Sequence, residues 1–144
     1  MMHFRARGVA VQSDKIFLAH HLGGKGHYFL PGGHIEDGEA ARRTVEREYL
    51  EETGLTVTAT DFLFASEHAY VDEQGQHAEI NLIFKVEGDI PTEPTSAEEH
   101  LEFVWVAAAD LHTINFLPTQ FIPPLVAYIE GRAVPSFHST IRKE

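Results

Sequence analysis

The hydrophobic pattern divides the chain into short extended segments and one amphipathic helix. Residues 4–11 and 15–20 are rich in β-branched and aromatic side chains, and the polar turn between them predicts a hairpin. Other extended segments are expected at 28–30, 56–60, 63–70, 77–86 and 101–106. The strands on either side of the turn at 72–75 predict a second hairpin.

A helical period follows the glycine-rich segment at 32–38. Ala41, Val45 and Tyr49 recur at i, i+4 and i+8, which predicts the helix face that packs against a sheet. Asp37 is expected to cap the first turn, and Gly54 is expected to end the helix.

The rest of the chain predicts a single domain over residues 1–144. A short helix is expected at 107–111, a closing helix from the two prolines at 123–124, and a loop at 87–100. The tail at 132–144 has weak periodicity and is expected to be partly ordered. Strands that alternate with helices and hairpins predict an α/β fold, in which a mixed sheet carries helices on both faces.

The amino-acid composition limits the kinds of molecule that the protein is expected to bind. The formal net charge is −11 and no basic patch is visible, which argues against a nucleic-acid polymer. The absence of cysteine excludes disulfides, a thiol nucleophile and a cysteine-based zinc site. No apolar signal core or membrane-spanning run is present, so no membrane partner is expected and a cytoplasmic location is the default expectation.

Three glutamates of the central helix lie close together. At about 100° per residue, Glu48, Glu51 and Glu52 fall within an arc of roughly 100°. Like charges this close are destabilising unless a cation binds them. Carboxylate oxygens suit a hard divalent cation such as Mg²⁺, which commonly shares them with phosphate. The spacing therefore favours a cation site over a solvated acidic face.

Residues 33–55 resemble the Nudix box, G-x5-E-x7-R-E-U-x-E-E-x-G-U, where U is a bulky apolar residue. Every fixed position matches, and one U position holds Tyr49 where an aliphatic residue is usual. The matching residues are Gly33, Glu39, Arg47, Glu48, Glu51, Glu52 and Gly54. The resemblance implies a MutT-like Nudix hydrolase, with an α/β/α sandwich that carries a loop–helix–loop catalytic element.

The resemblance also implies roles for these residues. Glu48, Glu51, Glu52 and the Gly32 carbonyl would bind Mg²⁺, with Mn²⁺ as a substitute. Arg47 lies four residues before Glu51, close enough to orient a carboxylate. Glu39 would hold the loop against the helix or bind metal through water, and Gly33 and Gly54 would be structural.

A further carboxylate is expected from a downstream loop. Family members often add one there, as a metal ligand or general base. Glu99 is the first candidate and Glu98 the second, because both lie just before the predicted strand at 101–106. Glu48 remains another candidate for the general base, and the sequence leaves this choice open.

The sequence predicts the residues that contact the substrate less clearly than the metal ligands. His34 directly follows Gly32-Gly33 and is a candidate phosphate contact. Arg5 and Arg7 alternate on the first strand and point the same way; Tyr70 lies about fifteen residues past the box. These residues are candidate substrate contacts, with exposed strand charges and core packing as the alternatives.

The expected function is metal-dependent hydrolysis of a pyrophosphate linkage in a nucleoside diphosphate derivative. A nucleoside triphosphate, a dinucleoside polyphosphate and a nucleotide sugar all remain open as the small nucleotide substrate. The alternatives are a catalytically inactive Nudix-like domain that senses nucleotides and a plain scaffold with an acidic helix. The sequence does not decide whether the protein is a monomer or a homodimer.

Overall fold

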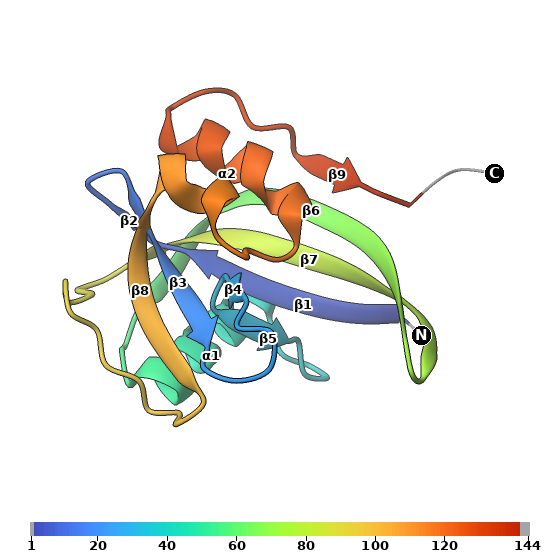
Figure 1. Ribbon diagram of the computed structural model, residues 1–144, viewed down its shortest axis with the longest axis horizontal. Helices are drawn as coiled ribbons and strands as arrows, with labels where there is room; N and C mark the ends of the chain where they lie inside the picture. The colour runs from blue at the N-terminus through green and yellow to red at the C-terminus, as the bar shows by residue number, and fades with distance from the viewer. Residues whose placement is uncertain (1, 142–144) are drawn as a thin grey trace.

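A computed structural model describes residues 2–141 of the chain, in which strands and helices are mixed (Figure 1). The strands are β1 (Met2–Val9), β2 (Val11–Gln12), β3 (Lys15–His21), β4 (Tyr28–Phe29), β5 (Gly32–His34), β6 (Thr58–Asp72), β7 (Gly75–Glu87), β8 (Leu101–Ala107) and β9 (Phe137–Ser139). The α-helices are α1 (Ala41–Thr53) and α2 (Ile122–Ile129), and the 3-10 helices are η1 (Ala108–Thr113) and η2 (Thr119–Phe121).

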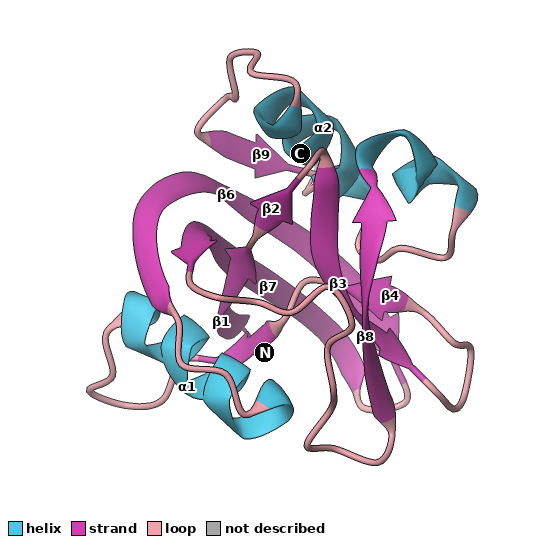
Figure 2. Cartoon of the chain, turned by 90° about the vertical axis from the view of Figure 1, so that its left-hand side faces the viewer, coloured by secondary structure: helices cyan, strands magenta, loops and turns pink. Residues whose placement is uncertain are grey.

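These strands form two sheets. The larger has the order β5–β1–β7–β6–β9 and is mixed, because β1 runs parallel to β7 while β6 runs antiparallel to it. The smaller sheet contains β2, β3 and β4, and β8 also pairs with β3. Figure 2 shows α1 and α2 on opposite sides of the strands. The predicted α/β architecture with a mixed sheet is confirmed, with its strands divided between two sheets.

The first predicted hairpin was wrong over most of its length. The expected strand 4–11 is split at Ala10, where the chain passes from the larger sheet to the smaller one. Only Val11 and Gln12 pair with β3, while β1 pairs with β5 and β7. A period-two pattern predicts which face of a strand is buried, but the partner strand depends on distant residues.

The second hairpin is confirmed. β6 and β7 pair antiparallel from Thr58↔Glu87 to Asp72↔Gly75. The two segments expected at 56–60 and 63–70 belong to one long strand, β6, whose register shifts between Ala59 and Phe64. Such irregularities bend a strand and interrupt its alternation, which explains why the sequence pattern divides there.

Helix α1 starts later than predicted. Asp37 lies in a turn before the helix, and the N-cap residue is Ala40, without a side-chain cap. The predicted end is confirmed, because Gly54 has a φ of 77° and its N–H donates to the Leu50 carbonyl. The predicted inner face is confirmed as well, since Val45 and Tyr49 are fully buried.

Two cores hold the layers together. Helix α1 packs Val45 and Tyr49 against a cluster that includes Phe17 and Phe84, and α2 packs Leu125 against a second cluster on the other side. The closing helix with its two N-terminal prolines is confirmed as α2. The tail contributes β9, which pairs parallel with β6, and residues 142–144 lie outside the described part of the chain.

Candidate active site

The short strand β5 brings its glycines directly against the acidic face of α1. A Cβ atom placed on Gly33 would lie 2.5 Å from Glu48 Oε1 and 2.8 Å from its Cδ. Glycine is therefore required at this position for the Glu48 carboxylate to keep its place. The adjacent Gly32 has a φ of 152° and lies close to the backbone of β1, so a side chain there would collide with the Ala6 carbonyl.

Arg47 connects the loop before α1 with the helix carboxylates. Its Nε and Nη2 donate to both oxygens of Glu39, at 2.7 and 3.0 Å, and Nη2 also donates to the His34 carbonyl. Its Nη1 donates to Glu48 Oε1 at 3.0 Å and to Glu51 Oε2 at 3.3 Å. The Arg47 guanidinium and the Thr44 hydroxyl lower the pKa of Glu39 to about 2. Glu39 is therefore charged at neutral pH and ties the loop to the helix.

Glu48 and Glu52 form the buried part of the carboxylate cluster. The Glu48 side chain is only 16% exposed, and Glu52 Oε2 is buried without a hydrogen-bond partner among residues 2–141. Burial, together with the neighbouring Glu48 carboxylate, raises the pKa of Glu52. Two carboxylates that compete in this way are stabilised by an added cation, and the unpartnered Glu52 oxygen is available to it.

The third glutamate of the face, Glu51, is more exposed than Glu48. The Glu51 side chain is 54% exposed and is paired with Arg47. In the described part of the chain, no three histidine, aspartate or glutamate side chains stand ready to hold a metal ion. The cluster still fits a divalent cation of the magnesium type, because such ions commonly use one or two protein carboxylates and complete their shell with water and phosphate.

Glu98 is a downstream carboxylate whose charge acts on this cluster. Its charge contributes to the raised pKa of Glu52, and the loop before it is attached to α1 by the Ala97 N–H, which donates to the Glu52 carbonyl at 2.8 Å. Glu98 is partly buried, whereas Glu99 is exposed. The structure therefore favours Glu98 over Glu99, the reverse of the order expected from the sequence.

A cavity of about 650 Å³ lies beside Gly32. The larger sheet contributes charged and aromatic side chains to it, β3 and β4 contribute further rings, and the segment before α2 contributes the remaining wall. The lining residues are Arg5, Arg7, His21, His27, Phe29, Gly32, His68, Tyr70, Glu79, Leu117, Pro118, Thr119 and Gln120. Three of the four residues predicted as substrate contacts, Arg5, Arg7 and Tyr70, therefore line one cavity together with Gly32.

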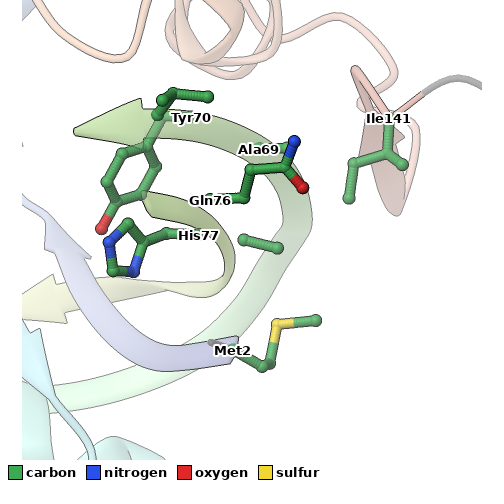
Figure 3. Close-up of a pocket in the computed structure, with 8 residues that line it drawn as sticks. Met2, Ala69, Tyr70, Gln76, His77 and Ile141 are labelled. Carbon is green, nitrogen blue, oxygen red and sulfur yellow. The ribbon is translucent and has the colours of Figure 1, made fainter. Parts of the chain in front are cut away.

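The fourth predicted contact, His34, lies elsewhere. Its ring is exposed and has its centroid 5.5 Å from that of His3, and the residue does not line this cavity. Tyr70 stacks on His77 with centroids 5.1 Å apart, and both also border a second cavity behind the β6–β7 turn (Figure 3). Among residues 2–141, the lining of that second cavity includes no carboxylate or arginine.

Sequence reasoning missed the polar residues of β7. His77, Glu79 and Asn81 alternate along this central strand and are all buried, with Asn81 fully so. Buried polar residues at i, i+2 and i+4 between apolar residues indicate a polar face within the protein interior. This alternation was present in the sequence, and it includes Glu79, which lines the cavity beside Gly32.

The comparisons with known proteins agree with this geometry. A family model of the NUDIX domain matches residues 2–125. The chain therefore belongs to the Nudix family and is a Nudix hydrolase, an enzyme class that cleaves pyrophosphate linkages. Members of this class generally use divalent metal ions.

The relatives of this chain are named for different substrates. "Putative 8-oxo-dGTP diphosphatase 2" of Mycobacterium tuberculosis is 30% identical over 114 residues, which cover 75% of this chain and 74% of that protein. The NAD-capped RNA hydrolase NudC of Actinobacillus succinogenes is 40% identical over 73 residues, which cover 46% of this chain and 28% of that protein.

Solved structures of low sequence identity share the fold. The MutT protein from Methanosarcina mazei Go1 superposes with a TM-score of 0.70 at 20% identity and covers 90% of this chain and 94% of its own. An ADP-ribose pyrophosphatase from Streptococcus suis gives a TM-score of 0.65 at 19% identity, with 95% and 98% covered. The predicted Nudix fold is confirmed. Within residues 2–141, no helix has the length and apolar character needed to cross a bilayer.

Proposed function

We propose that the chain catalyses the Mg²⁺-dependent hydrolysis of a pyrophosphate linkage in a small nucleoside diphosphate derivative. The observation that carries this proposal is the buried, unpartnered Glu52 Oε2 beside Glu48, on a helix face that glycines approach closely. A buried carboxylate oxygen without a partner costs free energy, and a bound cation would remove that cost.

Four groups of the chain would hold the cation. Glu48 and Glu52 supply the buried carboxylates, Glu51 supplies an exposed one after releasing Arg47, and Gly32 supplies its backbone carbonyl. A bound Mg²⁺, or Mn²⁺ in its place, neutralises diphosphate oxygens and lowers the pKa of a water ligand. The other residues contribute by orientation and proton transfer.

Arg47 positions the carboxylates. Both oxygens of Glu39 fix the orientation of its guanidinium, which donates a hydrogen bond to Glu48 from that fixed position. Glu98 is the proposed general base, which would accept the proton of the attacking water. It lies on the loop that is hydrogen-bonded to the end of α1. Glu48 is the other candidate, and the exposed Glu99 is less well placed than either.

The cavity and the relatives support a small nucleotide as the substrate. The aromatic side chains Phe29 and Tyr70 offer stacking surfaces for a base, while Arg5 and Arg7 offer cations for phosphate. The relative named as a putative 8-oxo-dGTP diphosphatase, which is matched over 74% of its length, supports a nucleoside triphosphate. The net charge of −11 disfavours a polymeric nucleic acid and is compatible with a cytoplasmic enzyme.

A release assay tests this proposal. The wild-type protein would be incubated with nucleoside triphosphates, dinucleoside polyphosphates and nucleotide sugars in Mg²⁺, in Mn²⁺ and in EDTA. We expect turnover of at least one panel member in either metal and none in EDTA. Nucleotide binding without turnover would support the sensor alternative, and a melting temperature unchanged between EDTA and millimolar Mg²⁺, also without turnover, would contradict a cation site.

A further inference from the structure

The His20 side chain connects the loop between β3 and β4 to strand β8. The residues directly opposite His20 on the neighbouring strands are Tyr28 of β4 and Glu102 of β8. The His20 ring stacks on Tyr28, with the ring centroids 3.9 Å apart and the planes 5° from parallel. Its Nδ1 lies 2.7 Å from Glu102 Oε1, and its Nε2 lies 3.1 Å from the carbonyl oxygen of Gly26 in the loop. One imidazole therefore joins two segments that are far apart in the chain.

Both hydrogen-bond partners of His20 are acceptors. Neither a carbonyl oxygen nor an ionised carboxylate can donate a hydrogen bond. A neutral imidazole has a single N–H and can donate to only one of the two partners, whereas an imidazolium can donate to both. The observed geometry, in which each ring nitrogen lies within hydrogen-bond distance of an acceptor, is therefore that of a protonated ring.

The groups around the ring act on its charge in different directions. Glu102 pairs with it directly, and in residues 2–141 no other carboxylate lies within ion-pair distance of His20. Tyr28 presents the face of an aromatic ring, which attracts a cation. His27 responds to the charge: burial, and to a smaller extent the charge of His20, lower the pKa of His27. Both rings are therefore not expected to be charged together.

The His20 contact lies behind one wall of the cavity of about 650 Å³ described above. His21 and Phe29 line that cavity, and adjacent residues of a strand point to opposite faces, so His20 lies on the reverse side of this wall. The loop residue that His20 reaches, Gly26, directly precedes His27, which also lines the cavity. The position of the wall thus depends on where the loop is held.

Loss of the proton would release the loop rather than β8. A neutral ring would keep the shorter contact with Glu102, because hydrogen bonds to a charged acceptor are the stronger ones. The Gly26 carbonyl would then lose its side-chain donor. The loop at 22–27 contains three glycines, whose backbone has many accessible conformations once it is no longer held.

We propose that His20 is a positioning residue, which in its protonated form fastens the β3–β4 loop to β8 and holds this wall of the cavity in place. Histidine is the side chain that changes charge between about pH 5 and 8. The wall is therefore held at the acidic end of this range and is looser at the alkaline end. The consequence for catalysis rests on the proposed function, which places the substrate in this cavity.

NMR relaxation of the loop amides tests this inference without substrate or turnover. Backbone order parameters of Gly24, Gly26 and His27 would be measured from ¹⁵N relaxation at about pH 5.5 and about pH 8.5, on either side of the range in which histidine titrates. We expect values near about 0.85 at the lower pH, as in a rigid backbone, and a fall to about 0.6 or less at the higher pH.

Two variants separate the protonation of His20 from packing. In Glu102→Gln the amide can donate as well as accept, so it can donate to Nδ1 of a neutral His20 while the Nε2–H remains available to Gly26. We therefore expect the loop of this variant to stay ordered at both pH values. His20→Phe keeps an aromatic ring against Tyr28 but has no donor, so low order parameters are expected at both.

His112→Phe is the matched control, because it removes an exposed histidine of η1 and should reproduce the wild-type response to pH. Wild-type order parameters that do not differ between the two pH values would overturn the inference. An equal loss of order in Glu102→Gln at the higher pH, or an ordered loop in His20→Phe, would overturn it as well. If His20→Phe does not fold, the comparison of wild type with Glu102→Gln decides alone. Because no substrate is present, an absence of hydrolysis in the release assay would not affect this outcome.

Discussion

Gly33 offers the sharpest test of how the fold places the carboxylates. An alanine Cβ at this position would lie 2.5 Å from Glu48 Oε1, whereas ordinary contacts begin near 3.4 Å. No backbone strain is expected from the substitution itself, because Gly33 has no positive φ. Gly33→Ala therefore perturbs one carboxylate and leaves the strand geometry acceptable.

The structure gives the size of the effect. The Glu48 carboxylate must move by about 1 Å to clear the new methyl group, and misplacement of a reacting group by that distance can cost about a hundredfold in rate. Glu48 is the flexible end of a side chain and retains Arg47 as a partner, so the free energy of unfolding should change by only about 1 kcal/mol. Activity should thus fall far more than stability.

The assay is a double-mutant cycle on kcat, with thermal melting in parallel. Wild type, Gly33→Ala, Glu48→Ala and the double variant would be compared on one substrate in saturating Mg²⁺. Because Gly33 is proposed to act through Glu48, the added methyl group should have almost no further effect once the Glu48 carboxylate is absent.

Two results would refute this reasoning. Activity of Gly33→Ala within about twofold of wild type would mean that Glu48 can function from a displaced position. Additive losses in the double variant would mean that Gly33 acts by another route. Gly54→Ala is the matched control: it meets no atom within 4 Å but sits at a φ of 77°, so it should cost stability and spare kcat.

Three further predictions concern individual glutamates. Glu98→Gln should lower kcat by roughly 10²–10⁴ with KM little changed, while Glu99→Gln stays near wild type; the opposite ranking in steady-state kinetics would reassign the base. Glu39 has its pKa lowered from 4.5 to about 2 by Arg47, so its charge stabilises the fold above pH 4.5 and this contribution is lost as the pH falls towards 2. Chemical unfolding should therefore show a larger deficit for Glu39→Gln at pH 7 than at pH 3, and an equal deficit would speak against the Arg47 pair. Glu46 accepts the Ala59 N–H at 3.0 Å, so Glu46→Ala should lower the free energy of unfolding by about 1–2 kcal/mol and leave kcat within about twofold; a large loss of kcat would contradict the assigned helix face.

The contacts of Glu46 cannot be predicted from helix geometry alone. Helical rotation correctly places Glu46 away from the other glutamates and beside Arg43, with which it pairs at 3.0 Å. It suggests a free surface residue, yet the carboxylate is 20% exposed and reaches the start of β6. The partner comes from a strand thirteen residues later, which no local period can reveal.

The sequence by itself determined the family, the carboxylate-bearing helix and the features local to it. The fixed spacing of the box identifies the family. Within 41–53, α-helical geometry determines from the spacing which residues lie on the same face of the helix. For this reason the burial of Val45 and Tyr49 and the stop at Gly54 were predictable.

Only the tertiary structure decided which distant segments meet. The first predicted strand divides at Ala10 because its two parts belong to different sheets. The parallel pairing of β1 with β7 and the proximity of Glu98 to Glu52 bring together residues that are far apart in the chain. Strand alternation specifies faces, but register and partner follow from how all strands and helices pack together. The pairing that leaves Arg7 beside a neutral Asn81, and Arg5 beside Glu79, is therefore a property of the folded sheet.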